Sequence, residues 1–287
     1  MVRRNARVWH GTVFCWLLTG ALSPAAAAEG GVGGLLIAPT RVVVEARQRS
    51  AELTLMNRGS RTEAYRLEVV EKRMADDGRL EDLPQGETAP HSAAAMLRYS
   101  PRQVTLAPGE TQKVRLMVRR PADLVAGEYR SHLMIRTLPP PGEPPATEAD
   151  LGDGQLSVKL ITTTAVTIPL IVRHGETHVE MALTDLAWVA PAADAGAPRL
   201  GFRLTRAGTR SAYGDVTVEW EPAAGGAPVT LGTMRGVAVY APNRSRRVEI
   251  PLTADPVQRV AGVVRVTYRS PDGSSRSFLA ESSLALN

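Results

Sequence analysis

One stretch of the chain, residues 155–173, alternates in hydrophobicity for longer than an ordinary β-strand can use. Its sequence is QLSVKLITTTAVTIPLIVR. Read with a period of two, one face is apolar except for two threonines, and it consists of Leu156, Val158, Leu160, Thr162, Thr164, Val166, Ile168, Leu170 and Val172. Such alternation, with many β-branched residues, predicts one long strand.

The predicted length of this strand is its main constraint on the fold. Extended at ~3.3 Å per residue, residues 156–172 would span roughly 56 Å, whereas ordinary strands span ~17–20 Å. A sandwich domain buries only part of such a strand, so we expect one end to project or to serve two bodies at once. Because unpaired strand edges promote aggregation, an exposed apolar edge of this kind needs a functional reason.

The first residues predict a secretory signal peptide. Three arginines within the first seven residues are followed by an apolar run over residues 13–22 and by an A-x-A cleavage site at residues 26–28. We therefore expect export, with cleavage after Ala28. The apolar run is too short for a transmembrane helix and no other stretch approaches ~20 apolar residues, so we expect no membrane span in the mature chain. An N-terminal membrane anchor is the alternative.

Charge and cysteine content argue against several function classes. Removal of residues 1–28 takes away three arginines and no acidic residue, so the formal net charge falls from +5 to +2. The chain has no basic stripe interleaved with aromatic residues, so nucleic acid is not an expected partner. The single cysteine, Cys15, lies in the predicted signal peptide. The mature chain can therefore form no disulfide and offers no cysteine-based metal site or nucleophile.

The remainder of the chain predicts an all-β protein with two sandwich domains, residues 29–173 and 174–287. In the first, strand-like runs (35–44, 51–56, 64–74, 114–119 and 129–137) are separated by hairpin-like turn signals at 57–60 and 76–78 and by a Pro-Gly turn signal at 107–110. A loop rich in proline and acidic residues, 138–154, leads into the long strand, and residues 174–177 predict a hinge. About seven further runs follow (179–189, 199–206, 214–222, 229–240, 246–252, 261–269 and 275–286), the number typical of an immunoglobulin-like sandwich.

The sequence offers no support for catalysis or for a bound metal or cofactor. His174, Glu176 and His178 have a metal-like composition, but their order and their place in a hinge do not match a helical zinc motif. Asp76, Asp77 and Asp82 could be a carboxylate cluster, although a hairpin turn explains the first two. No nucleophile elbow, phosphate-binding loop or dinucleotide fingerprint is present. We expect a protein that is not an enzyme.

Arg41 is the strongest candidate binding residue, because it lies among the β-branched residues of the first mature strand-like run. A guanidinium held in a cleft can grip a carboxylate through two hydrogen bonds. A solvated arginine on a strand edge is the alternative, and the residues alone do not decide between the two.

Several motifs of the first predicted domain resemble those of the periplasmic chaperones of pilus assembly, the PapD-like family. The motifs are TRV at 40–42, LTLMN at 53–57, YSPRQVTLAPGETQKVRL at 99–116, GEYRS at 127–131 and LIVR at 170–173. The most specific of them is the pattern S-P…L-x-P-G-x-x-Q-x-x-R. The second domain matches only in size and strand content.

The resemblance implies two immunoglobulin-like domains set as a boomerang, and a chaperone that lends a strand to an incomplete pilin-like subunit. In that mode, called donor-strand complementation, alternate apolar residues of the long strand fill the groove of the subunit. The residues expected to be lent are Leu156, Val158, Leu160, Thr162 and Thr164, and a register shifted by two or four residues along the strand is the alternative. Arg41 takes the role of the arginine that holds the C-terminal carboxylate of the subunit, and Glu128 with Arg173 resembles an internal salt bridge.

The sequence departs from the family pattern at one important position. The family has a cleft lysine that also holds the carboxylate, and the expected position falls on Pro169. Lys159 is the only lysine in that stretch and lies far nearer the loop. Either Arg41 holds the carboxylate with help from elsewhere, or subunits are anchored differently.

The resemblance also implies the cellular role and the partners. These are a periplasmic location, a role in pilus assembly, and delivery of subunits to an outer-membrane usher. A dimer in which two copies cap each other's exposed edge is left open. The alternative from another class is a structural or adhesive tandem of immunoglobulin-like domains with no chaperone role.

Overall fold

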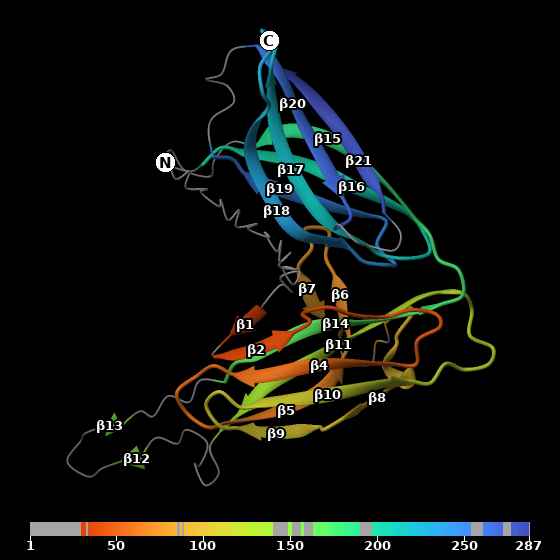
Figure 1. Cartoon of the computed structure of the whole chain (residues 1–287), viewed down its shortest axis with the longest axis vertical. Coiled ribbons are helices and arrows are strands. Elements are labelled where there is room, and N and C mark those ends of the chain that lie inside the picture. The colour runs from red at the N-terminus through yellow and green to blue at the C-terminus, as the bar shows by residue number, and fades with distance from the viewer. Residues whose placement is uncertain are drawn as a thin grey trace, which may run out of the picture.

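The computed structural model describes residues 30–32, 34–84, 87, 89–139, 149–150, 156–157, 163–189, 197–253, 261–271 and 277–286. These residues form an all-β protein, with a single turn of 3-10 helix, η1 (Ala94–Met96). Two β-sandwiches meet at an angle in a boomerang arrangement and are joined by one chain crossing after β14 (Figure 1). The predicted fold class is therefore confirmed. No helix of the described ranges has the length and apolar character needed to cross a membrane.

The first sandwich consists of two five-stranded sheets that pack on a shared core. One sheet has the order β1 (Gly30–Val32), β2 (Leu35–Ala38), β4 (Ser50–Asn57), β10 (Thr111–Val118), β8 (Leu97–Ser100); the other has the order β3 (Val42–Val44), β14 (Ala165–His174), β11 (Gly127–Leu138), β5 (Glu63–Val70), β9 (Gln103–Leu106). Alternate residues of these strands point inward and are buried, including Leu53, Leu67 and Leu170. The period-two pattern of the sequence thus reports the buried face of each strand.

The segment predicted as one strand over residues 35–44 is divided between the two sheets. β2 pairs with β4 in the first sheet, whereas β3 pairs in parallel with β14 in the second. The crossing contains Pro39, which has no N–H to continue a ladder, and ends at Arg41. The prediction of a single strand is therefore wrong at this point, and the crossing places Arg41 immediately before β3.

The turn at residues 57–60 was expected to resemble a hairpin, but it connects strands of different sheets. β4 and β5 do not pair with each other, and Asn57 stabilises the corner between them. Its side-chain amide donates to the carbonyl oxygens of Arg61 (2.7 Å) and Leu106 (2.9 Å), and its Oδ1 accepts from the N–H of Gly59 (2.9 Å). A buried asparagine therefore replaces the ladder bonds that a hairpin would have supplied.

The single strand predicted over residues 155–173 is also divided. β14 begins at Ala165, while β13 (Leu156–Ser157) pairs with β12 (Ala149–Asp150) outside the sandwich; residues 158–162 lie outside the described residues. The ladder of β14 with β11 begins at Ala165 opposite Arg136, although β11 itself continues to Leu138. At that end, the N–H of Thr164 donates to the side-chain oxygen of Thr137 (3.0 Å) instead of to the main chain. The alternating pattern does not show where the ladder with the partner strand ends, so the prediction of one continuous strand is wrong.

The second sandwich contains the seven predicted strands. Its sheets have the orders β15 (Val179–Val189), β16 (Arg199–Gly208), β19 (Ser245–Pro251), and β18 (Val229–Val239), β17 (Ala212–Pro222), β20 (Gly262–Arg269), β21 (Leu279–Leu286). A second core, formed by buried residues such as Phe202, Val218 and Tyr268, lies between them. The sequence prediction of seven strands in this half of the chain is confirmed.

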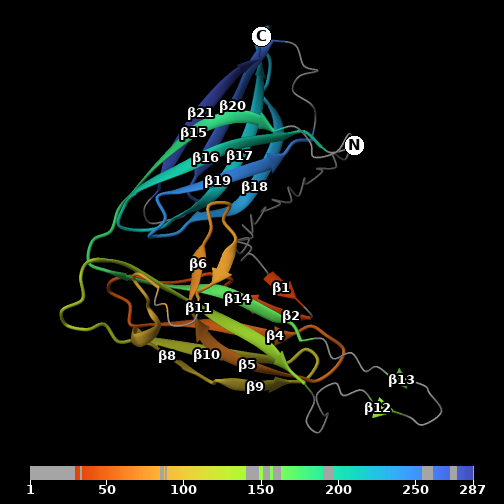
Figure 2. The ribbon, with the colours of Figure 1, turned by 180° about the vertical axis from the view of Figure 1, so that it is seen from behind.

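A small apolar cluster joins the two sandwiches. Met74 and Ile171 from the first sandwich pack against Ala238 and Tyr240 from the second. Met74 belongs to a hairpin of β6 (Lys72–Met74) and β7 (Leu80–Asp82) that projects toward the second sandwich (Figure 2).

Polar contacts at the tip of this hairpin add to the apolar cluster. Asp76 pairs with Arg203 (3.0 Å), and its carbonyl oxygen accepts from the N–H of Arg247 (2.7 Å). The carbonyl oxygen of Met74 accepts from the amide of Asn243 (2.9 Å). Apolar packing and polar bonds therefore both hold the sandwiches at a defined angle.

His132 lies on the outer face of the β14 sheet, within this interface. Its ring is fully buried, stands edge-on to the ring of Tyr240 at 6.5 Å, and has no hydrogen-bond partner for either nitrogen among the described residues. Burial, with the nearby positive charges of Arg130 and Lys72, lowers the pKa of His132 from 6.5 to about 3. His132 is therefore neutral in the folded protein at any ordinary pH.

This burial predicts a stability that falls in mild acid. The unfolded chain takes up a proton at His132 near pH 6.5, whereas the folded chain does not until about pH 3. The contribution of neutral His132 to the free energy of unfolding is complete above pH 6.5. It falls as the pH drops below that value, and about 2 kcal/mol is lost at pH 5. Urea unfolding at pH 7 and pH 5 should show this extra loss in the wild type and not in His132→Leu. Equal losses in the two proteins would contradict the assignment.

Candidate functional site

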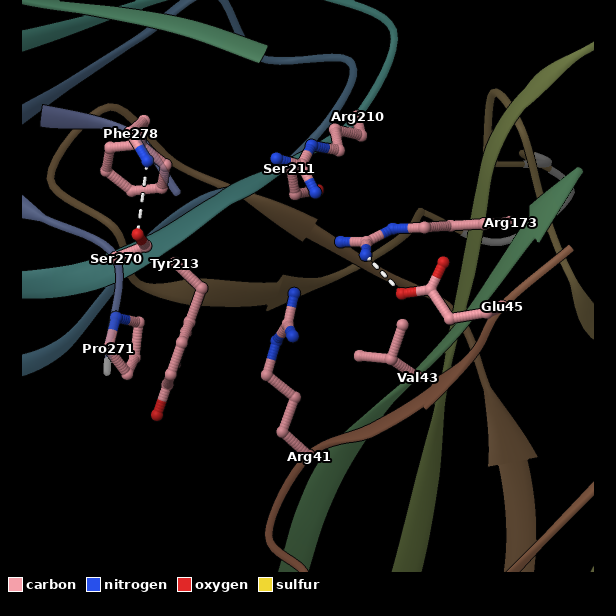
Figure 3. A pocket seen from close by; sticks show the side chains of 10 residues that line it. All are labelled: Arg41, Val43, Glu45, Arg173, Arg210, Ser211, Tyr213, Ser270, Pro271 and Phe278. Atoms are coloured by element: carbon pink, nitrogen blue, oxygen red, sulfur yellow. Dashed lines mark hydrogen bonds and ion pairs between the residues drawn. The ribbon is translucent and has the colours of Figure 1, made fainter. Parts of the chain in front are cut away.

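A cavity of about 230 Å³ lies between the two sandwiches, beside the crossing from β2 to β3. Figure 3 shows its walls, which come from both domains: Arg41, Val43, Glu45, Arg173, Arg210, Ser211, Tyr213, Ser270, Pro271 and Phe278. The first four belong to the first sandwich and the rest to the second. Three guanidinium groups and three hydroxyl groups face a space with one lining carboxylate, Glu45, so the cavity favours an anionic or hydrogen-bond-accepting group.

Arg41 points into the centre of this cavity (Figure 3). Its guanidinium carbon lies 4.7 Å from the centre of the Tyr213 ring, a cation–π contact that holds the side chain away from solvent. Its Nε and Nη2 are buried and have no hydrogen-bond partner among the residues that the structure describes. Nε and an Nη form the fork with which arginine binds a carboxylate. These two nitrogens of Arg41 are therefore positioned to bind such a group, while the guanidinium also contacts Tyr240.

Tyr240 lies beside Arg41 at the base of the interface. Burial raises the pKa of the Tyr240 hydroxyl, and the positive charges of Arg41 and Arg130 partly oppose this rise. The guanidinium of Arg130 lies over the Tyr240 ring, 4.3 Å from its centre. One tyrosine of the second sandwich therefore neighbours two arginines of the first, and this arrangement fixes where the guanidinium of Arg41 can lie.

Glu128 and Arg173 form a buried ion pair next to the cavity. Arg173 Nε donates to Glu128 Oε2 (3.1 Å), and Arg173 Nη1 donates to Glu45 Oε1 (2.6 Å). Glu128 Oε1 accepts from the N–H of Ser211 (3.1 Å) and from its hydroxyl, so the same carboxylate bonds to both sandwiches. The pair has the geometry of a structural link between β11, β14 and the second domain.

Arg120 supports this link from the hinge side. Its guanidinium donates to the carbonyl oxygens of Arg173 (3.1 Å), Glu45 (2.8 Å) and Gln48 (2.7 Å). Burial lowers the pKa of Arg120, and the nearby charge of Arg49 lowers it further. The ends of β3 and β14 are thereby fixed to one another at the point where the chain crosses to the second domain.

The first half of β14 has one edge with which no described strand pairs, although β1 lies close to β14. β11 pairs with the whole strand on one side, but on the other side β3 pairs only with Leu170, Ile171 and Val172. Among the described residues, nothing pairs with the outer edge of residues 165–169. Because Arg41 directly precedes β3, it lies where the covered part of this edge gives way to the open part.

Most of the residues expected to be lent to a subunit lie outside the described residues. Val158, Leu160 and Thr162 do so, as does Lys159; Leu156 is described only as a strand residue paired with Asp150. Thr164 is half-buried at the start of the open edge, where its carbonyl oxygen accepts from the N–H of Thr137 (2.9 Å). The structure therefore brings together Arg41, Glu128 and Arg173. Of the residues expected to be lent, it describes Thr164 at the start of the open edge and Leu156 in β13.

Pro169 occupies the position at which a lysine was expected. It is buried in β14, opposite His132 of β11. Its ring shares the outer face of the sheet with Ile171, which belongs to the interface cluster. No lysine side chain takes its place among the described lining residues of the cavity.

The other polar candidates are accounted for by local pairing. No group of three histidine, cysteine or acidic side chains within the described ranges could hold a metal ion. Asp76 pairs with Arg203, Asp77 with Arg79 (2.6 Å) and Asp82 with Lys72 (2.5 Å). These carboxylates therefore serve the interdomain hairpin and do not form a cluster of their own.

Sequence reasoning missed the contribution of the second domain to the cavity. Tyr213 lies in β17, and Ser211 and Phe278 directly precede β17 and β21. None of them belongs to a motif, and only the angle between the sandwiches brings them to the cavity of Arg41. A period-two pattern identifies which face of a strand is buried, but it does not identify which polar residues meet across a domain interface.

The double role of Glu128 predicts a large effect of its substitution. Glu128→Gln leaves Arg173 without its buried partner and weakens the bonds to Ser211, so the free energy of unfolding should fall by about 3–5 kcal/mol. Glu45→Gln is the matched control, because Glu45 is half exposed and an exposed pair contributes about 0–1 kcal/mol. Urea unfolding of the full chain measures both. Equal effects would show that Glu128 is not the link described here.

Comparisons with known proteins give only distant likeness. No protein-family model matches the chain, and no curated protein matches it. In the CsuC–CsuE chaperone–tip adhesion subunit pre-assembly complex from archaic chaperone–usher Csu pili of Acinetobacter baumannii, the matched chain is 13% identical, with 86% of this chain and 97% of that chain covered and a TM-score of 0.46.

Two further solved structures give similar values. The Pseudomonas aeruginosa CupB2 chaperone is 15% identical, with 86% of this chain and 100% of that chain covered and a TM-score of 0.43. The Salmonella enterica SafA pilin in complex with the SafB chaperone gives 13% identity, coverage of 89% and 98%, and a TM-score of 0.43. The solved structures to which this chain is similar are thus chaperones, but with TM-scores below 0.5 its function has to be argued from its own residues.

Proposed function

We propose that this protein is a periplasmic chaperone that binds pilin-like subunits by strand addition and delivers them to an outer-membrane usher. The observation that supports the proposal is the open edge of β14 over residues 165–169, with the unfilled guanidinium of Arg41 at its end. An open edge attracts a further strand, and an unfilled guanidinium attracts a carboxylate.

The charge of Arg41 selects the direction of the added strand. A strand on the open edge lies in line with β3, so one of its ends meets Arg41. If it runs parallel to β14, as β3 does, that end is its C-terminus and its carboxylate meets the guanidinium. If it runs antiparallel, an ammonium group or an uncharged chain meets a positive charge instead. The site therefore favours a parallel strand that ends in a free carboxylate.

The affinity of the complex comes mainly from the apolar residues that precede β14. If a subunit buries Leu156, Val158 and Leu160, each contributes ~1.5–3 kcal/mol, which gives ~5–9 kcal/mol before the cost of ordering. A hydrogen bond from the buried guanidinium of Arg41 to a carboxylate adds ~1.5–3 kcal/mol. In this proposal Arg41 determines where the strand ends and adds to the affinity, and the lent residues supply the larger part of it.

The alternative function is a structural or adhesive tandem of immunoglobulin-like domains. Such a protein has no use for a guanidinium whose Nε and Nη2 are buried without acceptors, because each unmet donor costs free energy. The geometry of Arg41 therefore favours the chaperone. If a second copy of this chain covers the open edge instead, the purified protein will have the size of a dimer.

The first test removes the guanidinium. Arg41→Ala should abolish co-purification of a pilin-like subunit co-expressed in the periplasm, because the C-terminal carboxylate loses its charged donor. Loss of a bond to a charged group corresponds to about ten-fold or more in affinity. Arg47→Ala, at an exposed arginine after β3, is the control and should leave the complex unchanged. The free variant should keep its unfolding temperature within a few degrees. Normal recovery of the subunit with Arg41→Ala would remove Arg41 from the mechanism.

The second test addresses the lent residues. The triple substitution Leu156→Asp, Val158→Asp and Leu160→Asp should prevent stable accumulation of the subunit, because three charges would enter an apolar groove. The matched control carries Ser157→Asp and Ile161→Asp, which lie on the opposite face of the alternating pattern. If subunits accumulate equally with the triple variant and with the control, the strand-lending mechanism is wrong.

A further inference from the structure

The main-chain groups of β14 alternate in direction, and one hydrogen bond fixes which residues face the open edge. The N–H of Thr137 donates to the carbonyl oxygen of Thr164 at 2.9 Å, and Thr137 is the residue of β11 directly opposite Thr164 when the register is extended by one pair. In an antiparallel ladder, hydrogen-bonded and non-hydrogen-bonded pairs alternate. The main-chain groups of even-numbered residues of β14 therefore face β11, and those of Ala165, Thr167 and Pro169 face the open edge.

Pro169 is the last residue in this open series. The residue after it, Leu170, is already opposite Val42 of β3. A proline has no N–H, so at this position the edge offers a carbonyl oxygen but no donor. The ladder with β11 is unaffected, because the N–H that is missing would have pointed away from β11.

We propose that Pro169 fixes the register of the added strand by withholding the main-chain donor that would meet its C-terminal end. This inference rests on the proposed function. A parallel strand on the open edge exchanges hydrogen bonds with Ala165 and Thr167, and the next donor in the series is absent. The terminal carboxylate of the strand then lacks a main-chain partner from β14, and Arg41 is the donor at that place.

The same arrangement explains the unmet groups of Arg41 and the position of the proline together. A residue with an N–H at position 169 would share the carboxylate with Arg41 and would let the strand advance toward β3. Proline removes this competing donor, so the strand stops where the guanidinium can take both oxygens through its Nε and Nη2. The ligand class is thus an extended peptide with a free C-terminal carboxylate, held in one register.

The direction of the main-chain groups can be tested in the free protein. Thr167→Pro removes an N–H that faces the open edge, whereas Val166→Pro removes one that bonds to β11. The unfolding temperature of Thr167→Pro should stay within a few degrees of the wild type, and that of Val166→Pro should fall sharply. If Thr167→Pro is as destabilising as Val166→Pro, the assigned direction is wrong and the proposal for Pro169 fails with it.

The effect of the withheld donor on peptide affinity can be tested with peptide probes. The probes are short fluorescein-labelled peptides that begin with two lysines for solubility, continue with alternating valine and threonine, and end in either a free carboxylate or an amide. Fluorescence anisotropy with the full chain measures their affinity. Thr167→Pro should weaken binding of the free acid about ten-fold, and Pro169→Ala should tighten it by a similar factor because it restores a donor to the carboxylate. The gain should be smaller for the amide.

The outcomes separate this inference from the proposed function. If Arg41→Ala and Thr167→Pro both weaken binding of the free acid but Pro169→Ala does not tighten it, strand addition stands and the role of Pro169 is overturned. If the free acid binds wild type and Arg41→Ala equally, the anchor of the proposed function fails instead. A second variant, Pro169→Thr, also restores the donor but carries a β-branched side chain, and its affinity should match that of Pro169→Ala.

Discussion

One buried carboxylate, that of Glu128, bonds directly to both sandwiches and links them at the observed angle. Glu128 is almost fully buried and bonds at the same time to Arg173 of the first sandwich and to the N–H and hydroxyl of Ser211 of the second. A buried carboxylate is tolerated only when its charge and its lone pairs are all satisfied. The observed angle supplies both sets of donors, and it also brings Tyr213 next to Arg41. The apolar cluster and the polar contacts of the β6–β7 hairpin stabilise the same angle.

The need to satisfy polar groups also governs the open edge of β14. Natural sheets protect their edges with charges, prolines or short strands, and the edge described here has a proline and an adjacent arginine at one end. Pro169 interrupts the series of donors, and Arg41 places a positive charge where a strand would have to end. Both features discourage indiscriminate pairing by another sheet. Neither prevents a strand that brings its own carboxylate. In the proposed function, the edge therefore selects a strand that ends in a free carboxylate.

The sequence predicted those parts of the fold that depend on a single strand and its immediate turns. The seven strands of the second sandwich follow from alternation, and Gly109 has the positive φ (79°) that the predicted Pro-Gly turn requires. Predictions failed where one run of residues serves two sheets. Residues 35–44 read as one continuous run, yet Pro39 marks the point at which the chain changes sheet. The run over residues 155–173 continues the alternation throughout, but the ladder of β14 with β11 begins only at Ala165. Alternation reports a buried face and contains no information on the partner strand.

Only part of the candidate site could be predicted, because local motifs are visible in the sequence and contacts across the domain interface are not. Arg41, Glu128 and Arg173 lie within local motifs, so their importance could be inferred before their geometry was known. Tyr213 and Phe278 have no local signature, because their role arises from the angle between domains. Pro169 was the most informative departure from the expected pattern. A lysine at that position would add a further cation beside Arg41, whereas proline removes a main-chain donor and adds no charge. In the proposed mechanism, the absence of the lysine does not leave the end of the added strand undefined. Because β14 offers no competing donor at position 169, the carboxylate bonds to Arg41 alone, and Arg41 alone determines where the strand ends.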